Sequence, residues 1–432
     1  MIATMRNAWR VDEIREKLLF TLFMILLYRV GNAVTVPYIN TMMFRDYFSM
    51  LSNTVLGLMN TMSGSALERA SIFALSIQPY INASIIIQLL TIAIPALERL
   101  SKDGGEDGKK KIEKITRYST IAIAILQGYG YYILMRNGIE GQTMLSADAV
   151  GVWPPIIIVA TFVTGSALLM WMGEQITEFG IGNGISVILF ASIVSRFPTS
   201  LGRMITSIMA APASWWIYAL MLLGALAIVV LIVIVTNSER RIPVQYSKRV
   251  VGRKMYGGQS THLPMKVNMS GVLPVIFAQS IASVPATIAV FVPKMNDGWL
   301  MRIFNTEGLT YAFLYFLLII FFSYFYSTVQ FNPIEIANNL RKNGGFIPGF
   351  RAGKPTSEFI QNVLTKITLF GALYLAVIAI TPILISRFSE TASRSGISLG
   401  GTSVIIVVSV ALETIKQLEA QLLMRHYRGF LE

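Results

Sequence analysis

Few residues of this chain could carry out acid–base, nucleophilic or metal chemistry. There is no cysteine, which excludes disulfides and thiolate metal sites, and the two histidines, His262 and His426, lie in polar segments. The stretch GGEDGKK at 104–110 superficially suggests a phosphate-binding loop, but its glycine spacing is wrong and no Ser or Thr follows the lysine. Because the sequence contains no nucleophile–base pair and no metal-ligand cluster, we predict no enzymatic activity, no metal and no cofactor.

The more informative polar residues are neutral and lie inside apolar stretches. They are Gln78, Asn82, Gln88, Gln127 and Gln279. Such side chains form hydrogen bonds between packed membrane helices, or they line a gated path for a bulky solute that is not bound tightly. Carriers driven by ions need Asp, Glu or His within the membrane. The apolar cores of this chain contain almost no ionisable residue. Arg29 is the exception, and we expect its side chain to reach toward the membrane surface.

The elements that position these residues are membrane spans. The chain has 432 residues, of which 54% are hydrophobic and 14% charged, whereas soluble domains carry about 25% charged residues. A span needs roughly 20 apolar residues. Ten stretches approach this, at about 18–36, 71–95, 118–135, 154–172, 183–200, 214–236, 269–292, 309–330, 367–385 and 402–424. The first continues past Tyr28 without a cleavage site, so we predict a retained span.

Basic residues predict the orientation of these spans. Most of the 36 lysines and arginines fall in the N-terminal segment, the C-terminal segment and three loops at 98–117, 237–268 and 331–366. An excess of Lys and Arg marks the cytoplasmic side, and an even number of spans puts both ends on the same side. We therefore predict that both termini are cytoplasmic. The 98–117 loop, which mixes both charges around glycines, is predicted to form a solvated hairpin.

The length and turn residues of the two longest loops, 237–268 and 331–366, are not explained by a role in setting membrane orientation alone. The segment KNGGFIPGFRAGKP at 342–355 packs glycines and prolines around exposed aromatic residues and Arg351. Turn chemistry of this kind predicts a defined tip. Apolar residues exposed beside an arginine are typical of protein-docking surfaces. The alternative is that these charges only set the orientation.

Six segments together resemble the SecY family, the bacterial protein-conducting channels of the translocon. They are SGSALERASIFALSIQPYINASIIIQLL, MGEQITEFGIGNGIS, ERRIPVQYSKR, QSTHLPMKVNMSGVLPVIFA, NPIEIANNLRKNGGFIPGFRAGKPT and GGTSVIIVV. The resemblance covers nearly the whole chain. It implies an all-α integral membrane protein with ten transmembrane helices in two pseudo-symmetric halves of five, residues 1–200 and 201–432, around a central pore with a lateral gate.

The resemblance also implies a function and partners. The chain would pass unfolded preproteins across the bacterial cytoplasmic (inner) membrane and release apolar segments into the lipid. Signal-sequence-bearing preproteins are then its substrates. The small membrane subunits SecE and SecG would be its partners, and the SecA motor ATPase or the ribosome would drive transport.

Four groups of residues match functional parts of that family. The plug, at about 55–69, includes Gly57, Ser63, Gly64, Ser65, Ala66 and Leu67, and its small residues would let it leave at little cost; without the resemblance it reads as an outer loop. The pore ring is Ile77, Ile81, Ile185, Leu189, Ile276 and Ile406. The lateral gate contains Asn82, Gln127, Gln279 and Val284. The residues that bind SecA or the ribosome are Arg240, Arg241, Arg253, Lys254, Arg341, Lys342 and Arg351.

Spacing alone predicts a plainer role for the ring residues. Ile77 and Ile81 share one helix face, as do Ile185 and Leu189, because four residues separate each pair. By themselves these residues would be packing residues. Leu189 departs from the isoleucine usual at its position in the family. A rival to the channel is a polytopic secondary transporter for a neutral solute, although a transporter does not need two long basic loops.

Overall fold

The computed structural model describes most of the chain. It covers residues 6, 8–50, 55–102, 104–138, 143–149, 151–210, 215–246, 249–251, 254–256, 260–269, 271–291, 303, 308–388 and 401–428. The predicted docking residue Arg253 lies outside these ranges. The side chain of Lys254 is also outside the description, although its backbone belongs to a strand.

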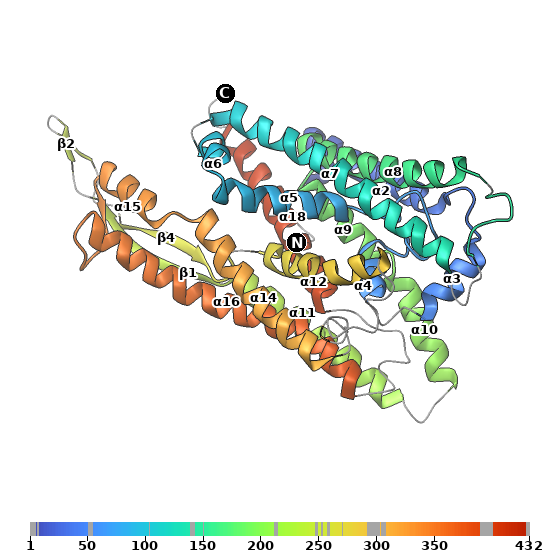
Figure 1. Cartoon of the computed structure of the whole chain (residues 1–432). Helices are drawn as coiled ribbons and strands as arrows, with labels where there is room; N and C mark the ends of the chain where they lie inside the picture. The colour runs from blue at the N-terminus through green and yellow to red at the C-terminus, as the bar shows by residue number, and fades with distance from the viewer. Residues whose placement is uncertain are drawn as a thin grey trace.

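The molecule is built mainly of helices (Figure 1). In its first part these are α2 (Asp12–Ala33), α3 (Thr41–Met50), α4 (Val55–Met62), α5 (Gln78–Ala93), α6 (Pro95–Lys102), α7 (Gly105–Asn137), α8 (Trp153–Phe179), α9 (Gly184–Val194) and α10 (Phe197–Ala210). In its second part they are α11 (Trp215–Asn237), α12 (Leu273–Phe291), α14 (Leu309–Gln330), α15 (Pro333–Lys342), α16 (Lys354–Phe388) and α18 (Gly401–Arg428).

Several of these helices are long and apolar enough to cross a membrane. Among the described residues there are five such segments, or six if the bent pair α5–α6 counts as one span. The five are Trp153–Phe179, Gly184–Met209, Trp215–Asn237, Leu309–Lys342 and Lys354–Ile385. The axis turns by 105° between α5 and α6, where Pro95 opens α6 and disfavours a helical conformation in the residue before it. The protein is a multi-pass membrane protein.

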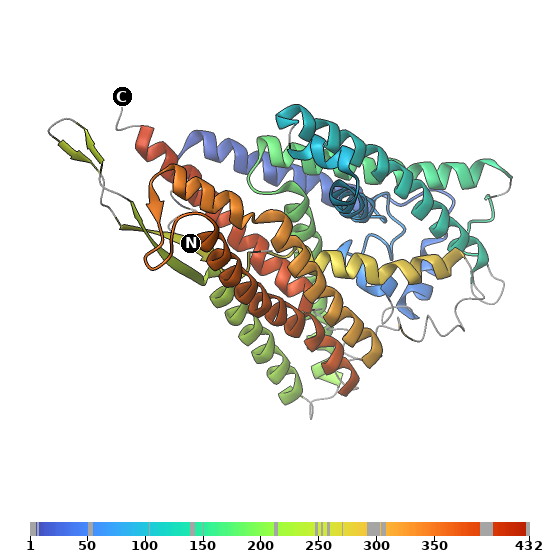
Figure 2. The ribbon, with the colours of Figure 1, turned by 60° about the vertical axis from the view of Figure 1, so that its left-hand side comes forward.

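The helices pack in a connected order. α7 contacts α5 and α8, α14 contacts α12 and α16, and α18 contacts α9, α11 and α16. α12 lies between these groups, with α5 and α7 on one side and α14 and α16 on the other (Figures 1 and 2). The largest apolar cluster runs through the middle, and its buried residues come from α2, α5, α8, α9, α11, α12, α14, α16 and α18 together with the end of α4.

Two predicted segments differ from the sequence-based expectation. Helix α5 begins at Gln78 rather than near residue 71, and Pro79 occupies its first turn, where a missing amide proton costs nothing. The solvated hairpin predicted at 98–117 is a helical one, formed by the end of α6 and the start of α7, which contact each other. Gly104 and Gly108 allow this close turn, since a Cβ on either would collide with the carbonyl of Leu100.

The expectation of an all-α protein is wrong for the two long loops. A three-stranded antiparallel sheet has the order β4–β1–β5, in which β1 (Glu239–Tyr246) pairs with β4 (Ser260–Lys266) and with β5 (Gly345–Phe346). A second pair joins β2 (Arg249–Val251) to β3 (Lys254–Tyr256). The sheet extends from one end of the helical body beside α15 (Figure 1). Residues from both loops therefore form one structure.

Candidate functional site

The six predicted ring residues all belong to the large central apolar cluster. Five of them are almost fully buried, with side chains at most 6% exposed: Ile77, Ile81, Leu189, Ile276 and Ile406. They arrive from the start of α5 and from α9, α12 and α18, while Ile185 of α9 is partly buried against the same cluster. The side chains of the six ring residues are all aliphatic. An ion passing between these six side chains would lose its hydration without gaining a polar partner from them.

The short helix α9 is placed by close backbone contacts. Asn183 caps its start, since the side-chain oxygen of Asn183 accepts a hydrogen bond from the amide of Ser186 at 3.2 Å. Gly184 lies against α8, where an added Cβ would collide with the carbonyl of Gly173. This close approach brings Ile185 and Leu189 to the centre of the molecule.

The predicted plug consists of α4 and the turns that follow it. Gly57, Ser63, Ala66 and Leu67 are buried, and Gly64 and Ser65 are partly buried. Gly64 lies against the C-terminal end of α9, where an added Cβ would come within 2.8 Å of the Ser192 carbonyl. The small residues therefore allow close contact. Met62 is buried in the central cluster and Leu67 in a second cluster, so the segment buries more apolar surface than its sequence suggested.

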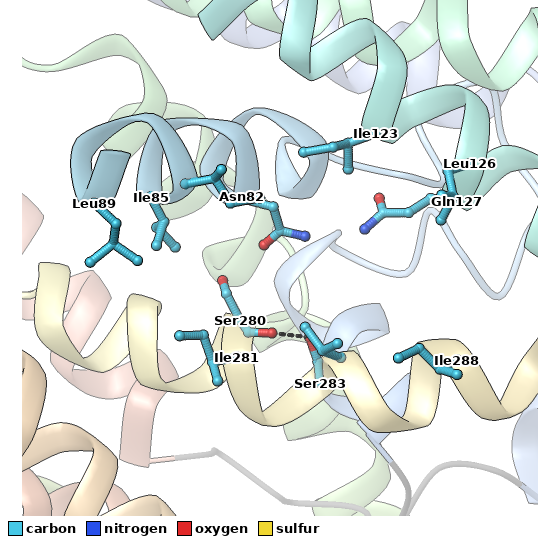
Figure 3. A pocket seen from close by; sticks show the side chains of 12 residues that line it. Asn82, Ile85, Leu89, Ile123, Leu126, Gln127, Ser280, Ile281, Ser283 and Ile288 are labelled. Atoms are coloured by element: carbon cyan, nitrogen blue, oxygen red, sulfur yellow. Dashed lines mark hydrogen bonds between the residues drawn. The ribbon is translucent and has the colours of Figure 1, made fainter. Parts of the chain in front are cut away.

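Three of the four predicted gate residues line one cavity. The cavity has a volume of about 440 Å³ and lies between α5, α7 and α12. Asn82, Gln127 and Val284 line it, whereas Gln279 is buried outside the lining. Figure 3 shows the amides of Asn82 and Gln127 pointing toward each other, with Ser280 facing them from α12. Within the described chain, the side-chain oxygens of Gln127 and Gln279 have no hydrogen-bond partner.

The sequence-based prediction missed the contact that crosses the seam between α5 and α12. The amide nitrogen of Gln78 donates a hydrogen bond to the hydroxyl oxygen of Ser280 at 3.2 Å. Ser283, one turn further along α12, also lines the cavity, and its hydroxyl donates to the Ser280 carbonyl at 2.7 Å. Polar residues on an otherwise apolar helix next to Pro285 were the available signal. A polar contact of this kind between membrane helices contributes about 0.6–2 kcal/mol.

The predicted docking tip has a defined conformation. Gly344, Gly349 and Gly353 have φ of 72°, 88° and 109°, values that residues with a side chain rarely adopt. The buried side chain of Ile347 fixes the tip to the sheet, in a cluster that includes Ile242, Val244, Met265, Leu340, Ile360 and Leu364. The rings of Phe350 and Phe359 also pack together, with centroids 4.3 Å apart.

Most of the predicted basic docking residues are exposed at this end of the molecule. The Arg351 carbonyl accepts a hydrogen bond from the Thr356 hydroxyl at 2.7 Å, while the Arg351 side chain is exposed. Arg240, Arg341 and Lys342 are exposed as well. Arg241 is also exposed and forms an ion pair with Glu239 at 2.7 Å. The tip therefore holds the Arg351 backbone in place and leaves its guanidinium to solvent.

A multi-pass helical membrane protein with a large apolar core, a cavity in the seam between helices and a structured basic end has the architecture of membrane channels and carriers. The SecY family profile matches residues 71–415 of this chain, which therefore belongs to the SecY family.

Similar proteins cover the full length of the chain. The protein translocase subunit SecY of Streptomyces scabiei is 41% identical over 441 residues, and that of Mycobacterium tuberculosis strain H37Rv is 40% identical over 447 residues. Each alignment covers 100% of both chains.

Solved structures share the fold at lower identity. A protein-conducting channel matches with a TM-score of 0.65 and 17% identity, covering 94% of this chain and 92% of its own. A SecY protein whose plug domain stabilises the closed state of its channel matches with a TM-score of 0.64 and 17% identity, over the same shares of the two chains. Sec61 of the canine ribosome–channel complex matches with a TM-score of 0.62 and 16% identity, again covering 94% and 92%.

Proposed function

We propose that this chain is the pore subunit of the general protein secretion channel in the bacterial cytoplasmic membrane. It passes unfolded preproteins across the membrane and releases apolar segments sideways into the lipid. One observation supports this proposal: the six residues matched to the ring of the family, at the start of α5 and on α9, α12 and α18, all lie in the central apolar cluster. A dry ring of aliphatic side chains excludes ions and yields to any passing side chain because its contacts have no direction.

The proposal includes the finer architecture. Ten helices cross the membrane in two halves, residues 1–200 and 201–432, with both termini in the cytoplasm. The cavity between α5, α7 and α12 belongs to the lateral gate, and the segment 55–69 is the plug. The Gln78–Ser280 bond supports the gate, since it joins the two faces of that seam and is weak enough for an apolar segment to replace.

The energy for transport comes from partners. SecE and SecG complete the membrane complex, and SecA or the ribosome docks on the cytoplasmic loops. The likeness to canine Sec61 and to the yeast Ssh1 complex bound to the 80S ribosome, with a TM-score of 0.55 for the latter, supports a ribosome partner. The exposed guanidinium of Arg351 suits a docked carboxylate, to which arginine can make two charge-assisted hydrogen bonds.

Charge reversal at the tip tests this function. We expect Arg351→Glu to abolish SecA-driven precursor uptake, and Arg351→Lys to give intermediate uptake because an ammonium keeps the charge but loses the planar fork. The assay measures ATP-dependent uptake of a precursor and stimulation of the SecA ATPase in vesicles with matched protein levels.

The control is Lys366→Glu, which reverses an exposed charge in the same loop, on α16, away from the tip. Uptake at the unmodified rate in Arg351→Glu would mean that the tip only marks orientation. Copurification tests the rival function as well, because a channel subunit brings small membrane subunits with it and a secondary transporter need not.

A further inference from the structure

The turn after α4 is closed by its own side chains. The Asn60 amide binds Glu68 twice: its nitrogen donates to a carboxylate oxygen at 2.9 Å, and its oxygen accepts from the Glu68 amide at 3.0 Å. Ser63 adds two bonds, since its hydroxyl donates to the Asn60 carbonyl at 3.0 Å and accepts from the Leu67 amide at 3.3 Å. We call residues 60–68 the closed turn.

The backbone of the closed turn is constrained as well. Gly64 and Ser65 both have a φ of 67°, and Ala70 just beyond the turn has a φ of 45°. A serine and an alanine adopt this left-handed conformation only where surrounding contacts impose it. The side-chain bonds and this constrained backbone therefore hold the closed turn in one defined conformation.

One phenol hydroxyl joins the closed turn to the helical body. The Tyr28 hydroxyl of α2 donates to the Ser63 carbonyl at 3.1 Å and lies 2.7 Å from the Ser192 hydroxyl of α9. Tyr28, Ser63 and Ser192 are each at most 1% exposed. The Tyr28 ring stacks on Phe73, with centroids 5.8 Å apart, so the ring stays in place whatever its hydroxyl binds.

The proton count of this group of atoms permits an exchange. Tyr28 has one hydroxyl proton, and so has Ser192, whose hydroxyl also lies 2.8 Å from the Ile188 carbonyl as a donor. While the turn is seated, Tyr28 donates to Ser63, and the single Ser192 proton can point to Ile188 or to Tyr28. When the turn leaves, Tyr28 can donate to Ser192, and Ser192 to Ile188. Each proton keeps an acceptor in both states.

We propose that Tyr28 and Ser192 form a hydrogen-bond exchange pair that positions the closed turn and lets it leave without stranding a buried hydroxyl. A buried hydroxyl left without a partner would oppose departure. This inference rests on the proposed function, in which the closed turn belongs to the plug. It gives Tyr28 the role of holding the turn and Ser192 the role of releasing it.

The two hydroxyls therefore have opposite predicted effects. Tyr28→Phe removes the bond to Ser63 and keeps the ring, so the turn leaves more often, by about fivefold for one neutral hydrogen bond. Ser192→Ala removes the second acceptor of Tyr28, so the turn leaves less often. The double variant should behave like Tyr28→Phe. A role limited to general packing would move both single variants in the same direction.

Thiol labelling measures the seating of the turn directly. The chain contains no cysteine, so Ser65→Cys in the reconstituted complex supplies a single thiol within the turn. We expect Tyr28→Phe to raise the labelling rate and Ser192→Ala to lower it. The control, Arg45→Gln, removes an ion pair to Glu68 whose 3.8 Å length and 70% exposed arginine make it weak. It should change the rate less than twofold.

Resting ion conductance separates this inference from the proposed function. Deletion of residues 56–69 should raise the conductance if the segment is the plug. Suppose that Tyr28→Phe and Ser192→Ala shift the labelling rate in opposite directions, but deletion of residues 56–69 leaves the conductance unchanged. The exchange pair would then stand, and the plug role of the segment would be refuted. Equal labelling rates in Tyr28→Phe and the unmodified protein, or a rise in Ser192→Ala, would overturn the exchange pair whatever the conductance.

Discussion

The buried anchor of the docking tip allows Arg351 to be displaced without changing any charge. Ile347 is 2% exposed and packs with side chains of β1, β4 and α16. We expect Ile347→Ala to detach the tip, so that Arg351 loses its fixed position while the loop keeps its charge and orientation. If position matters for docking, precursor uptake falls although Arg351 is still present.

The size of this effect follows from the burial of the side chain. Truncating a buried isoleucine to alanine costs about 2–5 kcal/mol. A cost of about 3 kcal/mol, at roughly 1.4 kcal/mol per tenfold change, raises the detached fraction on the order of a hundredfold if the tip opens locally. The main-chain bonds between β1 and β5 cover only two residue pairs, Gln245 with Phe346 and Tyr246 with Gly345, and cannot offset that loss.

In inverted vesicles, limited trypsin cleavage of the docking tip measures the detached fraction. Precursor uptake in the same vesicles measures docking. The control is Ile334→Ala on α15, where the same truncation removes a side chain that is 64% exposed. The reasoning fails if Ile347→Ala is cleaved no faster than Ile334→Ala. It also fails if cleavage rises strongly and uptake stays normal, since docking would then not depend on the position of Arg351.

Three further predictions concern the membrane part. Asn82 and Val284 line the same cavity, so cysteines at both positions should form a disulfide in the closed gate and block signal-sequence engagement. A disulfide needs Cα atoms within about 7 Å. The absence of crosslinking would mean that the lateral gate lies elsewhere. Gly165→Val should lower the melting temperature, because the new side chain would collide with the Ile72 carbonyl before α5. Gly224→Val on α11 should leave the melting temperature unchanged, because the space around Gly224 is open. Ile81→Asn should raise resting ion conductance in planar bilayers, and unchanged conductance would argue against the ring.

The helical part of the fold was accessible to sequence reasoning because hydropathy is a local property. Each of the ten predicted apolar stretches falls wholly or largely on a helix. The start of α5 was misplaced because the residues before it are apolar yet form turns, with Ser76 at a φ of 53°. Apolar composition reports burial, and a buried turn has the same composition as a buried helix.

The sheet of the two loops was not predictable in the same way. Gln245 pairs with Phe346, about a hundred residues later in the chain, and β5 has only two residues, too few for an alternating pattern. The ring residues pose a related problem. Each is an aliphatic residue among many, and only the resemblance to the SecY family singles out these six. The Gln78–Ser280 contact depends on how α5 and α12 pack, which a single sequence does not specify.

The pairing of β1 with β5 also constrains how the chain threads through the membrane. Strands bonded in one sheet lie on one side of a bilayer, so the chain between Tyr246 and Gly345 crosses an even number of times. The same parity holds at the other end of the helices. There Ile39 pairs with Leu145, and the chain between these two residues includes α5 and α7. A chain that inserted one helix of such a pair without the other would leave its bonding partners on opposite sides. The small sheets and bridges at the ends of the helices can therefore form only when the helices between them have crossed in pairs.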